Sequence, residues 1–376
     1  MAADNVPITG LDELDAHLDS LIEDPSLDIQ RALFDHVELQ LTESNIPSLI
    51  PRFLPKITEI LKAFQQDPAV LCSLAIRLLD PLTLTQVLSL ASEDALILAM
   101  RSPAPSANLL AISVLAKGAR SPGDAAILAV MKPLMTSFVT QWLSSPYVEV
   151  GERASRVLGS LLETDCEHSQ HATSSPSLAG SDYNANSAQT IATRASRPPG
   201  QGLMWRRIFQ DRDIYGLILA YCSTRQPSPS LDEKQRTLAQ GRVLRILPRL
   251  AALNLVAVSR SDLNDLYQQF STTITTTSTT ENSNEGRSAG LLQFAALHMI
   301  DKEDQLMQLS LVDFFETLVS IQATLPYSAY RTDTLKSLIA QATAQDDGLH
   351  RALSTLPERT VPEEAEELGR FLRTVL

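Results

Sequence analysis

Apolar residues along most of this chain recur every three to four positions, which is the spacing of an amphipathic helix. Nowhere do they alternate with polar residues as in a half-buried strand. The spacing is clear after Asp67, at Val70, Leu71, Leu74, Leu78 and Leu79, and after Ser121, at Ile127, Leu128, Met131, Leu134, Met135 and Phe138. It predicts further helices over residues 203–221, 231–253, 262–270, 291–300, 303–325, 334–344 and 363–376. The pattern therefore predicts an all-α protein.

A recurring Asp-Pro or Ser-Pro pair predicts where six helices begin. The Asp or Ser side chain can accept a hydrogen bond from a free amide of the first turn, and proline fits the first helical position. The pairs are Asp24-Pro25, Asp67-Pro68, Asp80-Pro81, Ser102-Pro103, Ser121-Pro122 and Ser145-Pro146.

The distances between these pairs suggest a repeat. Asp24 and Asp67 lie 43 residues apart, Asp80 and Ser121 lie 41 apart, and Ser102 and Ser145 lie 43 apart. A period of about 40 residues is typical of the helix pairs of HEAT and armadillo repeats. The alternative is that these pairs merely punctuate an ordinary helical protein. The uniform helical pattern favours a curved HEAT/armadillo-like solenoid, read as one array over residues 1–376.

The stretch from Leu306 to Val319 is apolar on much of its circumference, as expected of a helix that is buried between layers. It follows four charged residues, Asp301 to Asp304, whose acids suit the positive end of a helix dipole. We therefore expect a structural role for this helix.

Two segments interrupt the helical pattern. Residues 169–200 are rich in Ser, Ala, Asn, Thr and Pro, and residues 271–289 are mostly Thr, Ser, Asn and Glu. Neither composition can bury enough apolar surface to offset the entropy of ordering the chain. We interpret both as disordered inserts.

Composition and charge narrow the class of protein. Apolar residues make up 44% of the 376 residues but aromatic residues only 5%, which suits packed helices better than strands. The net charge of −13 disfavours direct binding to nucleic acid, which normally needs a basic surface. The three cysteines are widely spaced, and we recognise neither a signal peptide nor a membrane span. We expect a soluble protein of the cytoplasm and nucleus.

Motifs for catalysis or cofactor binding are lacking. The sequence has no phosphate-binding loop, no HExxH, no GxSxG and no CxxC, and no cofactor or small-molecule substrate is expected. Cys166, His168 and His171 have the spacing of metal ligands, but a closed zinc site needs a fourth ligand, so we expect surface residues and no metal. We expect a structural role for His298. An enzyme is thus not indicated.

One basic block stands out in the acidic chain. The net charge is −9 over residues 1–60, −3 over 61–193, +8 over 194–260 and −9 over 261–376. Within the block, Arg242, Arg245 and Arg249 share one helix face, and Trp205, Arg206 and Arg207 combine an aromatic side chain with two arginines. These six residues either bind an acidic partner or pair with acids of the same molecule.

Two segments of the chain resemble a fungal family. The first runs from Gly200 to Tyr215 and contains Gly-Gln-Gly, Trp205-Arg206-Arg207 and Asp211-Arg212-Asp213, and the second runs from Met299-Ile300-Asp301-Lys302-Glu303-Asp304 to Phe314-Phe315. They resemble HEAT-repeat chaperones that assemble the base of the proteasome regulatory particle. That family is related to the animal non-ATPase regulatory subunit 5, and is also described as DNA mismatch-repair-associated.

The resemblance implies a C-shaped helical solenoid without enzymatic activity. Its partners would be the C-terminal domains of the AAA+ ATPase subunits of the proteasome base, held before the base docks on the proteolytic core. Trp205, Ile208, Phe209 and Tyr215 lie in the resembling segment and could equally form the packing core of one repeat.

Two other functions are weaker. A nuclear scaffold in mismatch repair is the main alternative, although the net charge of −13 opposes direct DNA binding. An armadillo-like cargo adaptor would carry a ladder of Trp and Asn residues, whereas this chain has only Trp142 and Trp205.

Overall fold

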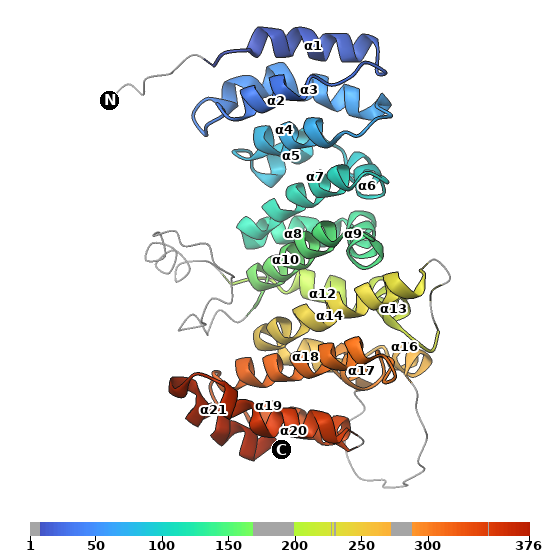
Figure 1. Cartoon of the computed structure of the whole chain (residues 1–376), viewed down its shortest axis with the longest axis vertical. Helices are drawn as coiled ribbons and strands as arrows, with labels where there is room; N and C mark the ends of the chain where they lie inside the picture. Colours follow the sequence, from blue (N-terminus) through green and yellow to red (C-terminus); the bar gives the residue numbers. More distant parts are fainter. Residues whose placement is uncertain (1–7, 168–198, 227, 229–230, 272–287, 345) are drawn as a thin grey trace. The chain divides into compact units, whose positions relative to one another are not determined.

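The computed structural model describes residues 8–167, 199–226, 228, 231–271, 288–344 and 346–376 (Figure 1). These residues form 20 α-helices, one short 3₁₀ helix at Lys117–Arg120 and a two-residue antiparallel strand pair. The predicted all-α class is confirmed. Most of the two predicted inserts, at 169–200 and 271–289, lies outside the described residues.

The chain divides into two compact units, residues 1–118 and 119–376. The helices of the first unit are α1 (Leu11–Glu23), α2 (Arg31–Glu38), α3 (Ile46–Ala63), α4 (Ala69–Leu79), α5 (Leu84–Leu90), α6 (Glu93–Met100) and α7 (Pro105–Ala116). Helix α3 packs on α1 and α4, and α7 packs on α4 and α6. Leu14, Phe34, Phe53, Ile57 and Leu78 are fully buried in its core.

The second unit contains thirteen described helices and the two strands. The helices before the first strand are α8 (Pro122–Val130), α9 (Lys132–Ser144), α10 (Val148–Thr164), α12 (Leu203–Phe209), α13 (Arg212–Cys222), α14 (Glu233–Leu253) and α15 (Leu255–Ser259). The rest of the unit is β1 (Arg260–Ser261), α16 (Asn264–Phe270), β2 (Ser288–Ala289), α17 (Leu291–Leu297), α18 (Gln305–Ala323), α19 (Ala329–Thr343), α20 (Asp347–Arg359) and α21 (Pro362–Val375).

Helices of the second unit pack as successive pairs. Helices α9 and α10 contact each other, as do α13 and α14. The first members of these pairs, α9 and α13, lie together, and so do the second members, α10 and α14. Helix α14 then packs on α18, so that α14 lies in the middle of a row of long helices (Figure 1). Trp142, Phe138, Tyr215 and Phe315 are buried in this packing.

Of the six predicted helix starts, only Ser121 is followed by a helix whose first residue is the proline. Its hydroxyl accepts a hydrogen bond of 3.1 Å from the Asp124 amide, and Pro122 is the first residue of α8. Asp24, Asp67, Ser102 and Ser145 instead accept hydrogen bonds from the amide two residues further on. These side chains close a tight turn around the proline. The amide bound by Asp67 is that of Ala69, the first residue of α4, so Asp67 still serves the first turn, whereas α7 and α10 begin one residue after the bonded amide. Thr83, rather than Asp80, caps α5.

Two other expectations about helices differ from the structure. The helix predicted over 203–221 is two helices, because the Asp211 carboxylate caps a new one by accepting hydrogen bonds from the amides of Asp213 and Ile214. At the start of α18, Leu306 and Leu309 are 66% and 68% exposed, whereas Met307 between them is buried. Further along α18, Phe314, Phe315, Leu318 and Val319 are buried as predicted, whereas Asp313 is exposed.

Candidate functional site

Helix α14 carries Arg242, Arg245 and Arg249, and the structure places them at the contact with α10. A Cβ atom added at Gly151 would lie 2.2 Å from Arg242 Nε, and one added at Gly159 would lie 2.9 Å from an Arg249 side-chain nitrogen. Residue numbers thus rise together along the two helices. It follows that α10 and α14 run in the same direction, side by side.

Arg242 is a buried structural residue. Its side chain passes over Gly151 and donates hydrogen bonds to the carbonyl oxygens of Trp142 (2.8 Å), Leu143 (3.2 Å), Ser145 (2.8 Å) and Tyr147 (3.3 Å). The first three carbonyls lie at the end of α9 and just beyond it, where carbonyls lack helical donors. The Tyr147 carbonyl also accepts a hydrogen bond from the Gly151 amide, at the start of α10. Burial lowers the pKa of the guanidinium, but arginine stays protonated in proteins. Arg242 is therefore inaccessible to a partner.

Arg245 and Arg249 point to the surface and pair with acids of α10. Arg245 pairs with Glu152, and Arg249 Nη2 lies 2.5 Å from Glu163 Oε2. The Arg245 side chain is 71% exposed and that of Arg249 is 45% exposed. Intramolecular pairing, one of the two sequence-based alternatives, is thus present, but it leaves both guanidinium groups open to solvent.

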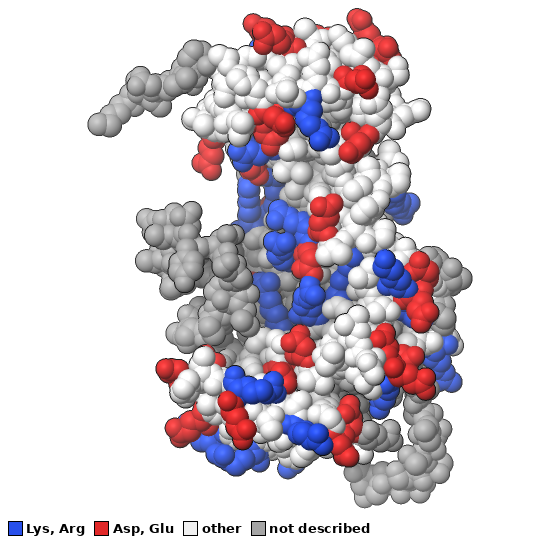
Figure 2. Space-filling model, viewed as in Figure 1, with Lys and Arg blue, Asp and Glu red and all other residues white. Residues whose placement is uncertain are grey.

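Helix α10 adds two arginines that the sequence reasoning missed. Arg153 and Arg156 are exposed, and neither forms an ion pair within the described part of the chain. In Figure 2, basic side chains predominate over α10 and α14. Sequence reasoning overlooked these arginines because they lie in the 61–193 segment, whose net charge is −3. Their three-residue spacing on a predicted helix was the available signal.

Trp205 belongs to the core. It is 4% exposed, its ring stacks on Phe209 at 5.4 Å, and its indole Nε1 donates to the Leu162 carbonyl oxygen at 2.9 Å. Ile208, Phe209 and Tyr215 are buried as well. The interpretation of this segment as a packing core is confirmed.

The buried carboxylate of Asp165 holds the start of α12. It accepts hydrogen bonds from the amides of Met204 (2.6 Å) and Gln201 (3.1 Å), beside Gly202, whose φ of 67° suits glycine. Burial raises the pKa of this carboxyl above its ordinary value, against the amide hydrogen bonds, which favour the charged form. Asp165 therefore fixes the position of the segment that carries Trp205, Arg206 and Arg207.

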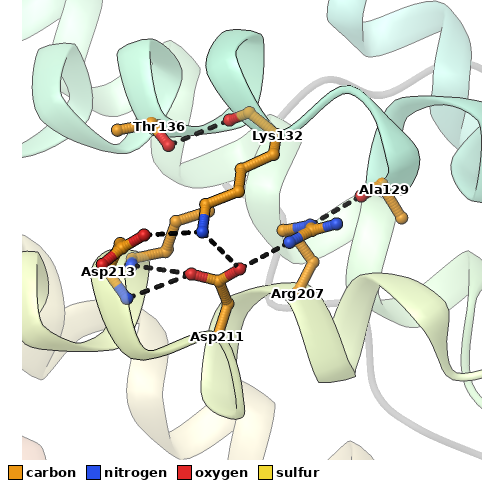
Figure 3. A network of polar contacts seen from close by, with 7 residues as sticks. Ala129, Lys132, Thr136, Arg207, Asp211 and Asp213 are labelled. Carbon is orange, nitrogen blue, oxygen red and sulfur yellow. Dashed lines mark hydrogen bonds and ion pairs between the residues drawn. The ribbon is translucent and has the colours of Figure 1, made fainter.

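Arg207 lies in a network of polar contacts that joins α12 and the start of α13 to α8 and α9 (Figure 3). Its Nε donates to the Ala129 carbonyl oxygen at 2.7 Å, and its Nη1 donates to Asp211 Oδ2 at 2.5 Å. Lys132 Nζ lies 3.0 Å from the same Asp211 oxygen and 2.6 Å from Asp213 Oδ2. We call these four side chains, Lys132, Arg207, Asp211 and Asp213, the α12–α13 corner. Its charges are largely neutralised within the molecule.

Arg206 is half-exposed and lines two clefts. Its Nη2 donates to the Gln201 carbonyl oxygen at 2.7 Å. A cleft of about 250 Å³ lies between α12, α15 and β1, with two cations and two carboxylates on its walls: Arg206, Arg260, Glu167 and Asp262. A cleft of about 280 Å³ lies on the other side, between α8 and α12, with Val130 and Leu203 among its apolar residues. Because the two cations and two carboxylates of the first cleft balance, its net charge favours neither an anionic nor a cationic ligand.

Of the candidate metal and catalytic groups, Cys166 and His298 belong to the described residues. His168 and His171 lie outside the described residues, and within them no group of three His, Cys, Asp or Glu side chains could hold a metal ion. Cys166 Sγ donates a hydrogen bond to the Leu253 carbonyl oxygen at 3.6 Å. Burial lowers the pKa of His298, which packs edge-on against Tyr267. These contacts fit structural roles.

Among the described residues, no single helix is long and apolar enough to span a membrane. The pair α8 and α9 reaches the required length and composition only when joined, and the two helices are bent by 93°.

No family model matches the sequence, and a search of curated proteins finds no match either. The geometry of the described residues is therefore the main guide to function. On the surface of α14 beside α10, Arg245 and Arg249 are exposed and their partners are acids of the same molecule.

Proposed function

We propose that this protein is a non-enzymatic helical-repeat scaffold that acts as an assembly chaperone of the proteasome regulatory-particle base. In this proposal it binds the C-terminal domains of AAA+ ATPase subunits and releases them once the base is complete. The observation that carries it is the stacking of two successive helix pairs. The first helices of the pairs, α9 and α13, pack on each other, and so do the second helices, α10 and α14.

That packing supports a HEAT-like repeat. In such repeats, one helix pair cannot bury its apolar faces alone, so each pair stacks on the next and two layers of helices result. The parallel course of α10 and α14, from the positions of Gly151 and Gly159, agrees with neighbouring second helices of two successive pairs. We infer a solenoid whose layer of second helices includes α10, α14 and α18.

The choice of partner rests on the resemblance. Its first segment, residues 200–215, forms α12 and the capped start of α13, and its second, residues 299–315, contains the Asp304 cap and the first half of α18. Capping by Asp211 and Asp304 and core packing by Trp205 and Phe314 explain part of each segment, which suits a scaffold. An extended helical surface fits the binding of a folded protein domain better than that of a small molecule.

The experiment that tests this function is affinity purification of the tagged protein from its own cells at moderate salt, with mass spectrometry to identify and count what is bound. We expect ATPase subunits of the base without the proteolytic core. The tag alone serves as the control. Recovery of repair factors or chromatin without ATPases would reject the proposal and favour a nuclear scaffold.

A further inference from the structure

Five cations lie on the exposed surface of two neighbouring helices, and we call them the α10–α14 basic face. They are Arg153 and Arg156 of α10 and Lys234, Arg245 and Arg249 of α14. All five are exposed, and Figure 2 shows basic side chains gathered in this region. The surrounding protein is acidic overall, with a net charge of −13, so this face is a local exception.

Helical periodicity brings these cations to one side of their helices. At 100° per residue, Lys234, Arg245 and Arg249 fall within a narrow stripe of α14. Gly241 lies in the same stripe, and a Cβ added there would meet nothing within 4 Å. Arg156 lies between Glu152 and Glu163 on the side of α10 that meets α14, with Arg153 at its edge. The centre of the stripe is thus open.

The ion pairs of the face hold some cations in place and leave others free. Glu152 and Glu163 orient Arg245 and Arg249. Within the described residues, no ion pair involves Arg153, Arg156 or Lys234. Exposed pairs contribute at most about 1 kcal/mol, so partner carboxylates can replace Glu152 and Glu163 at little cost.

The charge pattern favours an acidic protein segment over a nucleic acid. Three carboxylates, Glu149, Glu152 and Glu163, lie among the five cations. They would repel a continuous phosphate backbone, whereas carboxylate side chains spaced along a protein segment can be placed between them. Arginine also forms paired hydrogen bonds with carboxylates, which gives geometric selectivity.

We propose that the α10–α14 basic face docks an acidic segment of a protein partner. Arg153 and Arg156 of α10 and Arg245 and Arg249 of α14 would bind the carboxylates of that segment. This inference rests on the proposed function, because it assigns the surface that would hold the ATPase. It excludes the buried Trp205 and Arg242 from the contact.

The direct test is binding of a fluorescent oligoglutamate peptide to the full-length protein, measured by anisotropy. The double substitution Arg153→Glu and Arg156→Glu is compared with Arg370→Glu and Arg373→Glu, which make the same charge change on the exposed surface of α21. Thermal unfolding confirms that both variants are folded. We expect about tenfold weaker binding for the first variant only, a difference of about 1.4 kcal/mol, and weaker binding at high salt.

Equal weakening in both variants would show that only net charge matters, and would overturn the assignment of the face. Preferential binding of an oligothymidylate that is lost in the first variant would also overturn it, since the face would then bind nucleic acid.

Affinity purification of the Arg153→Glu, Arg156→Glu variant separates this inference from the proposed function. Base ATPases that are recovered with the wild type and lost with the variant support both. Base ATPases that are recovered equally with both proteins reject the basic face as the docking surface and leave the chaperone function intact. If the wild type recovers none, the proposed function itself fails.

Discussion

The α12–α13 corner and the α10–α14 basic face draw most of their cations from the same basic stretch of sequence, yet the structure uses them differently. In the corner, Arg207 and Lys132 contact the partly buried carboxylate of Asp211, and Arg207 also donates to a backbone carbonyl. On the face, Arg245 and Arg249 meet carboxylates at the surface, and Arg153 has no ionic partner among the described residues. In the proposed account, positive charge along the sequence indicates a binding surface only where the fold supplies no acceptor within the molecule.

The sharpest contrast lies within α14, between Arg242 and Arg245. Arg242→Ala removes the hydrogen-bond donor of buried carbonyl groups at the end of α9. We therefore expect the free energy of unfolding to fall by about 3 kcal/mol. Arg245→Ala removes only an exposed pair and should cost less than about 1 kcal/mol. Urea unfolding of both variants measures the difference, and equal losses would break the distinction.

Two helix glycines, Gly151 of α10 and Gly241 of α14, test the contact between Arg242 and α10. Ala at Gly151 would place a Cβ 2.2 Å from Arg242 Nε, so we expect Gly151→Ala to lower the free energy of unfolding by about 2 kcal/mol. Gly241→Ala, in the open stripe of α14, should instead raise it by about 0.5–1 kcal/mol through helix propensity. In an Arg242→Ala background the cost at Gly151 should shrink, and an unchanged cost would mean that Arg242 is not what the glycine accommodates.

The contribution of the α12–α13 corner to the free energy of unfolding should depend on pH. Asp211→Ala removes a helix cap and two ion pairs, and we expect a loss of about 1.5 kcal/mol at pH 7. Burial opposes the charged form, but hydrogen bonds from Lys132 and the amides of Ile214 and Asp213 outweigh it, so that the pKa of Asp211 lies below its ordinary value of about 3.8. The unfolded state then binds the proton more readily, so the stabilisation is present above that value and is lost as the pH falls through the folded pKa.

Unfolding at several pH values checks this prediction, with the more exposed Asp213→Ala as a control that should cost less than about 1 kcal/mol. A stability difference between wild type and Asp211→Ala that stays constant down to pH 2 would contradict the assigned role of the charge.

The smallest expected effect concerns α8, which packs on α12. Ser121→Ala removes the hydroxyl that caps α8 and should cost about 1 kcal/mol. Ser310→Ala, within α18, removes only a hydrogen bond to the Leu306 carbonyl of the same helix and should be nearly neutral. Thermal unfolding compares the two, and equal losses would mean that the Ser121 hydroxyl is not acting as a cap.

The helices and the core residues of α12 could be predicted from sequence, because apolar spacing records which side of a helix is buried. The division of the helix predicted over 203–221 could not, since the spacing does not show that the Asp211 carboxylate turns back to bond the amides of Asp213 and Ile214. The sequence also could not show that Arg242 is buried and Arg245 is exposed. Both belong to one helix face, and only the position of Gly151 and the end of α9 decides which guanidinium is buried.

Hydrogen exchange on the complex of this protein with a copurified base ATPase subunit tests the central claim most directly. The account predicts new protection in α10 (Val148–Thr164) and α14 (Glu233–Leu253), with little change at the α12–α13 corner. Protection confined to the corner, with α10 and α14 unchanged, would contradict it.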